Sequence, residues 1–138
     1  MVGRGLHDLV TRCLKTDDQE LIQRGTELFG AYYAEHLDRH SRLYPGAADV
    51  LKFFTSRQQA ILTNKPDPFA KDLVARLKIA EYFVEVITPL NGIKKPDPAR
   101  LLALMDRLGI GRPDTLFIGD SLIDWETSHH AGIDVLLL

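Results

Sequence analysis

Four polar residues stand directly beyond apolar runs of the chain, where their side chains could bind a phosphate and a metal ion. Asp120 and Asp124 lie four residues apart just after one apolar run. Thr63 ends a second run, and Lys95 comes a few residues after a third. A hydroxyl and an ammonium suit phosphoryl oxygens, whereas paired carboxylates suit Mg²⁺, a hard cation that takes oxygen ligands. These residue types therefore predict a phosphate-and-magnesium site.

Alternating strands and helices are expected to position these side chains. Strands are predicted at 59–63, 84–88, 115–118 and 134–138. Each is an unbroken apolar run of the kind that is typical of a strand buried on both faces. Apolar residues at helical spacing fall between the strands, which predicts an α/β fold with a parallel sheet covered by helices on both faces. Ligands bind beyond the carboxyl ends of such strands, so we expect the four polar residues to converge on one crevice.

The N-terminal part of the chain follows a different pattern. Apolar residues recur at helical spacing over 6–14 and again over 21–37, so residues 5–40 predict a helical hairpin. Thr16 or Asp17 is expected to cap the second helix, because short polar side chains accept hydrogen bonds from free N–H groups at a helix start.

Composition narrows the class of protein. The chain of 138 residues has 45% apolar and 26% charged residues and a net charge of −2, which is ordinary for one globular domain and predicts no nucleic-acid partner. No apolar run approaches the roughly 18 residues of a membrane span, and the first residues lack the apolar core of a signal peptide. Cys13 is the single cysteine and lies on the first apolar stripe, so we expect it in the core. A chain without an internal disulfide fits a cytoplasmic location, which we predict.

The tetrapeptide Lys-Pro-Asp-Pro occurs twice, at 65–68 and 95–98. Turn chemistry explains part of it: Asp67 and Asp97 are expected as helix N-caps, with the following prolines at the first helical position. This reasoning leaves the two lysines of the repeat unexplained.

At these residues the sequence resembles the haloacid dehalogenase superfamily of phosphatases. The stretch AILTNKP, which contains Thr63, resembles the second motif of that family. KKPDP, which contains Lys95, resembles the third, and GDSLID, which contains Asp120 and Asp124, resembles the fourth. The three motifs stand in the family's order, and the helical hairpin is similar to the small cap of its subgroup resembling phosphoglycolate phosphatase.

The resemblance implies a role for each candidate residue. It implies catalytic roles for Thr63 and Lys95, phosphate contacts for Thr63, Asn64 and Lys95, and Mg²⁺ binding for Asp120 and Asp124. Arg4, which lies between two glycines at the start of the cap, is a further candidate for contact with a substrate carboxylate.

The resemblance also implies an architecture. Residues 1–42 would form the helical cap, and residues 43–138 would form a Rossmann-like core that is incomplete at both ends. The family's reaction starts from an Asp-x-Asp motif on a central strand, between the strand ending at Thr63 and the strand ending at Asp120. No Asp in the chain is followed two residues later by another Asp. We therefore expect this chain alone to be inactive, and we expect a monomer or a homodimer, with strand exchange at the unpaired edges.

The expected function is Mg²⁺-dependent hydrolysis of a small phosphorylated metabolite similar to 2-phosphoglycolate. In the family the reaction passes through an aspartyl-phosphate, whose nucleophile is not in this chain. A non-catalytic relative that binds a ligand or partner is an open alternative. A receiver domain also places Asp, Thr and Lys around Mg²⁺, but it has no helical hairpin and needs an acidic pair after its first strand. Dehalogenase or sugar-phosphate mutase chemistry also remains open within the superfamily.

Overall fold

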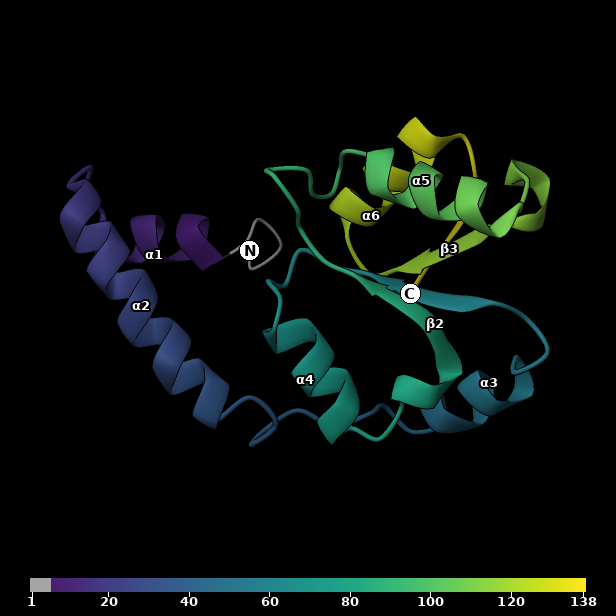
Figure 1. The fold of residues 1–138 in the computed structure, drawn as a ribbon, viewed down its shortest axis with the longest axis horizontal. Coiled ribbons are helices and arrows are strands. Elements are labelled where there is room, and N and C mark those ends of the chain that lie inside the picture. Colours follow the sequence, from purple (N-terminus) through teal and green to yellow (C-terminus); the bar gives the residue numbers. More distant parts are fainter. Residues whose placement is uncertain (1–5) are drawn as a thin grey trace. The chain divides into compact units, whose positions relative to one another are not determined.

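The computed structural model describes residues 6–138, which form helices and short parallel strands in two compact units (Figure 1). The first unit ends at Thr88, and the second runs from Pro89 to Leu138. The predicted α/β class is confirmed. The predicted boundary between a helical cap and an α/β core, after residue 42, stays a prediction.

The first unit begins with the predicted helical hairpin, formed by α1 (Leu6–Leu14) and α2 (Gln19–Glu35) (Figure 1). α1 packs against α2, and Val10 is buried in the hairpin. Cys13 is exposed, so the prediction that it lies in the core was wrong. The side of α1 that packs on α2 is the one that carries Val10 and Leu14, which lie against Gly25. Cys13 is on another side of the helix.

The start of α2 differs from the prediction by one or two residues. Asp18 is the N-cap, and its Oδ1 accepts hydrogen bonds from the N–H groups of Glu20 and Leu21 at 3.0 and 3.1 Å. Thr16 supports this cap, because its hydroxyl oxygen accepts the Asp18 N–H at 3.2 Å. The cap is therefore neither Thr16 nor Asp17 but the residue whose carboxylate reaches two free N–H groups.

Helices and strands alternate through the rest of the chain. In the first unit they are α3 (Ala47–Phe53), β1 (Gln59–Leu62), α4 (Phe69–Arg76), the short 3-10 helix η1 (Ala80–Tyr82) and β2 (Phe83–Ile87). In the second unit they are α5 (Ala99–Leu108), the 3-10 helix η2 (Arg112–Asp114), β3 (Leu116–Gly119), α6 (Leu122–Ala131) and β4 (Asp134–Leu137). Among residues 6–138, no helix has the length and apolar character that a membrane crossing requires.

Both sheets are parallel and two-stranded. β1 pairs with β2, and β3 pairs with β4, which confirms the predicted strand direction. Among the described residues, β1 and β3 each bond to no further strand, so each keeps one edge without a strand partner. Unpaired edges were expected at these two strands, because the family's central strand would stand between them.

The apolar strands are less buried than predicted. Leu116 and Ile118 of β3 are 57% and 54% exposed, and Leu136 of β4 is 47% exposed. The register places these three side chains on one face of the sheet, since Ile118 stands beside Leu136 and alternates with Phe117. α6 packs on both strands and α5 packs on α6 (Figure 1). Leu116, Ile118 and Leu136 stay exposed because these helices cover only the other face of the strands.

The repeated Lys-Pro-Asp-Pro segments precede α4 and α5, as predicted, but the caps shift by one residue. Pro68 and Pro98 occupy the N-cap positions rather than the first helical positions. Asp97 still satisfies a free N–H, because its Oδ1 accepts from Ala99 at 2.8 Å. Asp67 forms an ion pair with Lys71 at 2.5 Å instead.

Candidate functional site

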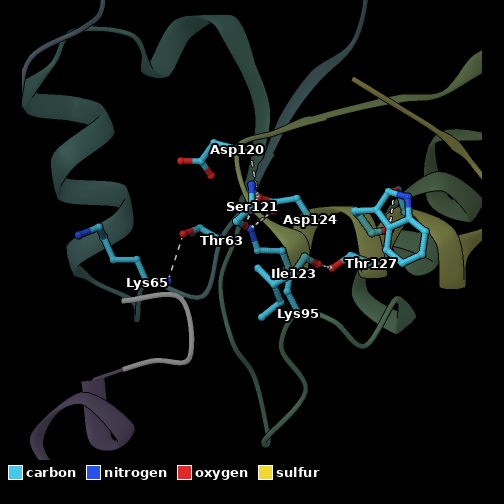
Figure 2. A network of polar contacts seen from close by, with 10 residues as sticks. Thr63, Lys65, Lys95, Asp120, Ser121, Ile123, Asp124 and Thr127 are labelled. Carbon is cyan, nitrogen blue, oxygen red and sulfur yellow. Dashed lines mark hydrogen bonds and ion pairs between the residues drawn. The ribbon is translucent and has the colours of Figure 1, made fainter. Parts of the chain in front are cut away.

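The turn between β3 and α6 is built around the carboxylate of Asp124. β3 ends at Gly119, and Ser121 is the extended N-cap of α6. Oδ2 of Asp124 accepts the backbone N–H groups of Asp120 and Ser121 at 3.2 Å each, and the Ser121 hydroxyl at 2.5 Å (Figure 2). One carboxylate oxygen thus holds the whole turn that carries Asp120.

Gly119 is required by the closeness of this carboxylate. A Cβ at position 119 would stand 2.3 Å from Cβ of Asp124, 2.6 Å from its Cγ and 2.8 Å from its Oδ2. Asp124 is only 3% exposed and its oxygens are bonded, so it has little room to move. The glycine therefore lets the end of the strand lie against the carboxylate.

The other oxygen of Asp124 binds Lys95. The Lys95 ammonium lies 2.6 Å from Oδ1, and the two side chains are only 13% and 5% exposed (Figure 2). The same ammonium lies 5.9 Å from the ring centre of Phe117 in β3. The structure therefore brings together two of the predicted site residues that are 29 positions apart in the chain.

A tight turn places Lys95 for this contact. Leu90 and Ile93 exchange two backbone hydrogen bonds of 3.1 and 2.9 Å across Asn91 and Gly92. Both central residues have positive φ, at 52° and 81°, which is the conformation that the Asn-Gly pair favours in two-residue hairpin turns. The Asn-Gly pair is a strong local signal for this turn, which was not among the predicted elements.

The electrostatics of the pair favour its ionised form. Burial raises the pKa of the Asp124 carboxyl, but the hydrogen bonds from Lys95 and Ser121, the Lys95 charge and the Asp120 N–H lower it by more. The net pKa of Asp124 therefore lies below its usual value. At neutral pH the Asp124 carboxylate is therefore ionised.

Asp120 differs from Asp124 in its surroundings. Asp120 is exposed, and Figure 2 shows its carboxylate directed away from the Lys95–Asp124 pair. Its backbone N–H binds Asp124, so its position is set by the main chain. Its carboxylate is thus the acidic group of this turn that faces solvent.

The carboxylate oxygens of this turn are ligands of the kind that Mg²⁺ prefers. Within residues 6–138, no group of three or more His, Cys, Asp and Glu side chains is arranged to hold a metal. Mg²⁺ differs from zinc in this respect, because it keeps several waters and needs only one or two protein carboxylates. The exposed Asp120 suits direct contact, whereas both oxygens of Asp124 already accept hydrogen bonds.

Thr63 and Asn64 lie in the first unit, directly after β1. The Thr63 N–H donates to the Ile87 carbonyl at 3.0 Å and thereby extends the pairing of β1 with β2. Its Oγ1 accepts the Lys65 N–H at 3.1 Å, which still leaves the hydroxyl hydrogen to donate. Asn64 is buried, at 6% exposure. That these residues meet Lys95 and Asp120 at one ligand stays a prediction.

Two further points concern Arg4 and Lys65. Arg4 lies outside the described residues. Tyr33 and Lys65 were not predicted as a pair, yet the Lys65 ammonium donates to the Tyr33 hydroxyl. The signal for Lys65 was the repeat, in which it corresponds to Lys95; nothing local pointed to Tyr33, which lies 32 residues away.

A family model and several known proteins are similar to this chain. Residues 1–138 match a family model described as haloacid dehalogenase-like hydrolase. The chain is 35% identical to phosphoglycolate phosphatase of Yersinia pseudotuberculosis, over 95% of this chain and 60% of the relative. It is 33% identical to phosphoglycolate phosphatase of Pseudomonas syringae pv. tomato, over 99% of this chain and 53% of the relative.

A crystal structure of a predicted phosphoglycolate phosphatase from Haemophilus somnus aligns with a TM-score of 0.86 at 27% identity, over 99% of this chain and 65% of that chain. The chain thus spans between half and two thirds of the length of these relatives.

Proposed function

Because this chain belongs to the haloacid dehalogenase-like hydrolase family, we propose that it carries the phosphate and metal residues of a Mg²⁺-dependent phosphomonoesterase. The observation that carries the proposal is the buried ion pair of Lys95 and Asp124 beside the exposed carboxylate of Asp120. A largely buried lysine next to a solvent-facing carboxylate is suited to bind a phosphate together with its cation.

Each residue then has a defined task. Lys95, held by Asp124, donates to a phosphoryl oxygen, and its charge stabilises the negative charge that builds up there. Thr63 and Asn64 donate to other phosphoryl oxygens from the end of β1. Asp120 contacts Mg²⁺, and Asp124 completes the acidic pair by orienting Lys95 and the Asp120 backbone. When bound, the metal neutralises phosphoryl charge.

The proposed substrate is a small phosphorylated metabolite similar to 2-phosphoglycolate. The names of the relatives from Yersinia pseudotuberculosis and Pseudomonas syringae pv. tomato support this class. The family resemblance implies an aspartyl-phosphate intermediate, and no Asp-x-Asp motif occurs in the 138 residues. We therefore propose that the chain needs a segment with this motif for turnover.

The test compares two proteins. The first is the 138-residue chain, and the second is the same chain preceded by an apolar strand ending in Asp-x-Asp. Hydrolysis of p-nitrophenyl phosphate and 2-phosphoglycolate is followed with and without MgCl₂. We expect turnover only in the second protein, only with Mg²⁺, and a loss of at least about 100-fold in its Asp120→Asn variant.

Other outcomes would decide against the assignment. Robust activity of the 138-residue chain that survives Asp120→Asn would show that the chemistry lies on other residues. Binding of a phosphate ester without turnover in either protein would favour the alternative, a non-catalytic relative that binds its ligand.

A further inference from the structure

Lys65 lies two residues beyond the proposed phosphate ligand Thr63, and its side chain is held by Tyr33 of α2. Its ammonium donates to the hydroxyl of Tyr33 in α2 and stands 4.6 Å from the centre of that ring. Both side chains are half-buried. The contact fixes the position of a positive charge beside the loop that follows β1.

Tyr33 is itself held from two sides. Its ring meets the ring of Phe69, the first residue of α4, edge-on at 5.4 Å and 87°. It also stacks on Phe29, one turn earlier in α2, at 5.6 Å. An aromatic side chain with two such neighbours has little rotational freedom, so it is a firm support for the ammonium.

The Lys65 charge is not neutralised by the residues that the structure describes. Some cations there do pair with carboxylates: Lys95 with Asp124, Lys71 with Asp67, and Arg76 with Asp38. The contacts of the Lys65 ammonium within residues 6–138 are a neutral phenol and an aromatic ring. A half-buried cation whose neighbours are neutral is available to bind an anion.

The geometry separates this charge from the phosphate position. The Lys65 N–H donates to Thr63 Oγ1 at 3.1 Å, and the Lys65 side chain extends away from that hydroxyl (Figure 2). A ligand whose phosphate is bound by Thr63 would therefore meet the ammonium with a different group, a few bonds away from phosphorus.

We propose that Lys65, oriented by Tyr33, is a specificity-determining residue that binds a second anionic group of the substrate. Lys65 would then distinguish a short phosphorylated carboxylic acid, the substrate class proposed above, from a phosphate ester of an uncharged alcohol. This inference rests on the proposed function, because it takes Thr63 as a phosphate contact. It also explains why both lysines of the repeat would matter: Lys95 would bind the phosphate, and Lys65 the carboxylate.

The experiment uses two ligands that differ in one group. Ethyl phosphate and 2-phosphoglycolate are both two-carbon monoesters, and only the second has a carboxylate. Their Kd values for the 138-residue chain are measured by isothermal titration calorimetry in MgCl₂. We expect the wild-type chain to bind 2-phosphoglycolate about tenfold more tightly, as a hydrogen bond to a charged group implies.

Four variants locate the effect. Lys65→Met keeps the apolar stem and removes the charge, and should bring the ratio of the two Kd values to about one without weakening ethyl phosphate more than about twofold. Lys65→Arg should keep most of the preference. Tyr33→Phe, which retains the ring, should reduce the ratio by about threefold. Lys71→Met, which removes a lysine paired with Asp67, is the matched control and should keep the wild-type ratio.

The outcomes separate this inference from the proposed function. The inference is wrong if the wild-type chain binds both esters equally, or if Lys65→Met keeps the preference for 2-phosphoglycolate. Either result would leave the proposed phosphate site unaffected. A preference that disappears in Arg4→Ala but not in Lys65→Met would also overturn it. A wild-type chain that binds neither ester would overturn the proposed function, and the inference with it.

Discussion

At the scale of single residues, Asp124 has two partners that belong to different parts of the chain. Oδ1 holds Lys95, which comes from the loop before α5, and Oδ2 holds the turn that carries Asp120. A change at this one carboxylate therefore affects the lysine and the exposed acid together. Charge and close packing at this position lead to two predictions.

The first prediction concerns pH. Burial raises the pKa of Asp124, but the hydrogen bonds of Lys95 and Ser121, the Lys95 charge and the Asp120 N–H leave it lowered overall. A lowered pKa in the folded state stabilises the fold above the unfolded-state value of about 3.9, and this stability is lost as the pH falls through the folded-state pKa. We expect the free energy of unfolding, measured with urea from pH 6 to about pH 3, to decrease less in Asp124→Asn than in wild type.

Asp38 is a second source of acid sensitivity, which that experiment must separate from the effect of Asp124. The hydrogen bond from Arg76 also lowers the pKa of Asp38, so wild type and Asp124→Asn share this source of acid sensitivity. The difference between the two curves is therefore the measured quantity. Parallel curves would show that the Lys95–Asp124 pair contributes no pH-dependent stability.

The second prediction concerns packing at Gly119. Gly119→Ala places a methyl group within 2.3 to 2.8 Å of three Asp124 atoms. We expect it to lower the free energy of unfolding by about 1–3 kcal/mol and to weaken phosphate binding, because Asp124 must move away from Lys95. Gly111→Ala is the matched control, since its new methyl group would meet Pro113 at an ordinary 3.5 Å. Equal stability of the two variants in urea unfolding would contradict the close packing.

At the scale of elements, α2 has two interior glycines in different surroundings. A methyl group at Gly25 would lie 3.0 Å from Val10 and 3.1 Å from Leu14 of α1, whereas one at Gly30 would lie 3.7 Å from Phe69. The helical gain from Gly to Ala is the same at both positions, so the two differ only in the contact that the methyl group makes.

We therefore expect opposite results from two matched substitutions. Gly30→Ala should raise the free energy of unfolding by about 0.5–1 kcal/mol, because alanine favours the helix and the contact with Phe69 is ordinary. Gly25→Ala should leave the free energy of unfolding unchanged or lower it, because α1 must shift to make room. Urea unfolding followed by circular dichroism measures both. A similar gain in both variants would show that α1 packs loosely on α2.

At the scale of the whole molecule, the residues proposed for the site are divided between the two compact units. Thr63 and Asn64 belong to the first unit, and Lys95, Asp120 and Asp124 belong to the second. β1 and β3 both have an edge without a strand partner among residues 6–138. The sequence predicts that these residues act on one ligand, and a binding experiment tests this prediction.

A double-mutant cycle tests whether the two units share a phosphate. Thr63→Val, Lys95→Met and the double variant are titrated with ethyl phosphate in MgCl₂. If both residues bind the same phosphate, the effects on the binding free energy should be non-additive by about 0.5–3 kcal/mol. The cycle of Thr63→Val with Lys71→Met should be additive. Additive effects in the first cycle would place Thr63 and Lys95 at separate sites.

The sequence by itself determined the order and type of the elements and the residues beyond the strands. Strand, helix and hairpin signals depend on the spacing of neighbouring side chains, so they can be read locally. The alternation that predicted α/β structure is confirmed, and so are the two helices of the hairpin. The capping residues were misplaced by one or two positions. Before α2, several short polar side chains could reach the same free N–H groups. Before α4, Pro68 takes the N-cap position without a side-chain hydrogen bond.

Only the tertiary structure decided which side chains meet. That Asp124 binds Lys95, that Asp120 faces solvent, that Cys13 is exposed and that Lys65 lies against Tyr33 all depend on how separate elements pack. The residues of each pair are 29 and 32 positions apart, and no periodicity in the sequence relates them. The distances between these side chains depend on how whole elements pack together. A local sequence pattern carries no information about that packing.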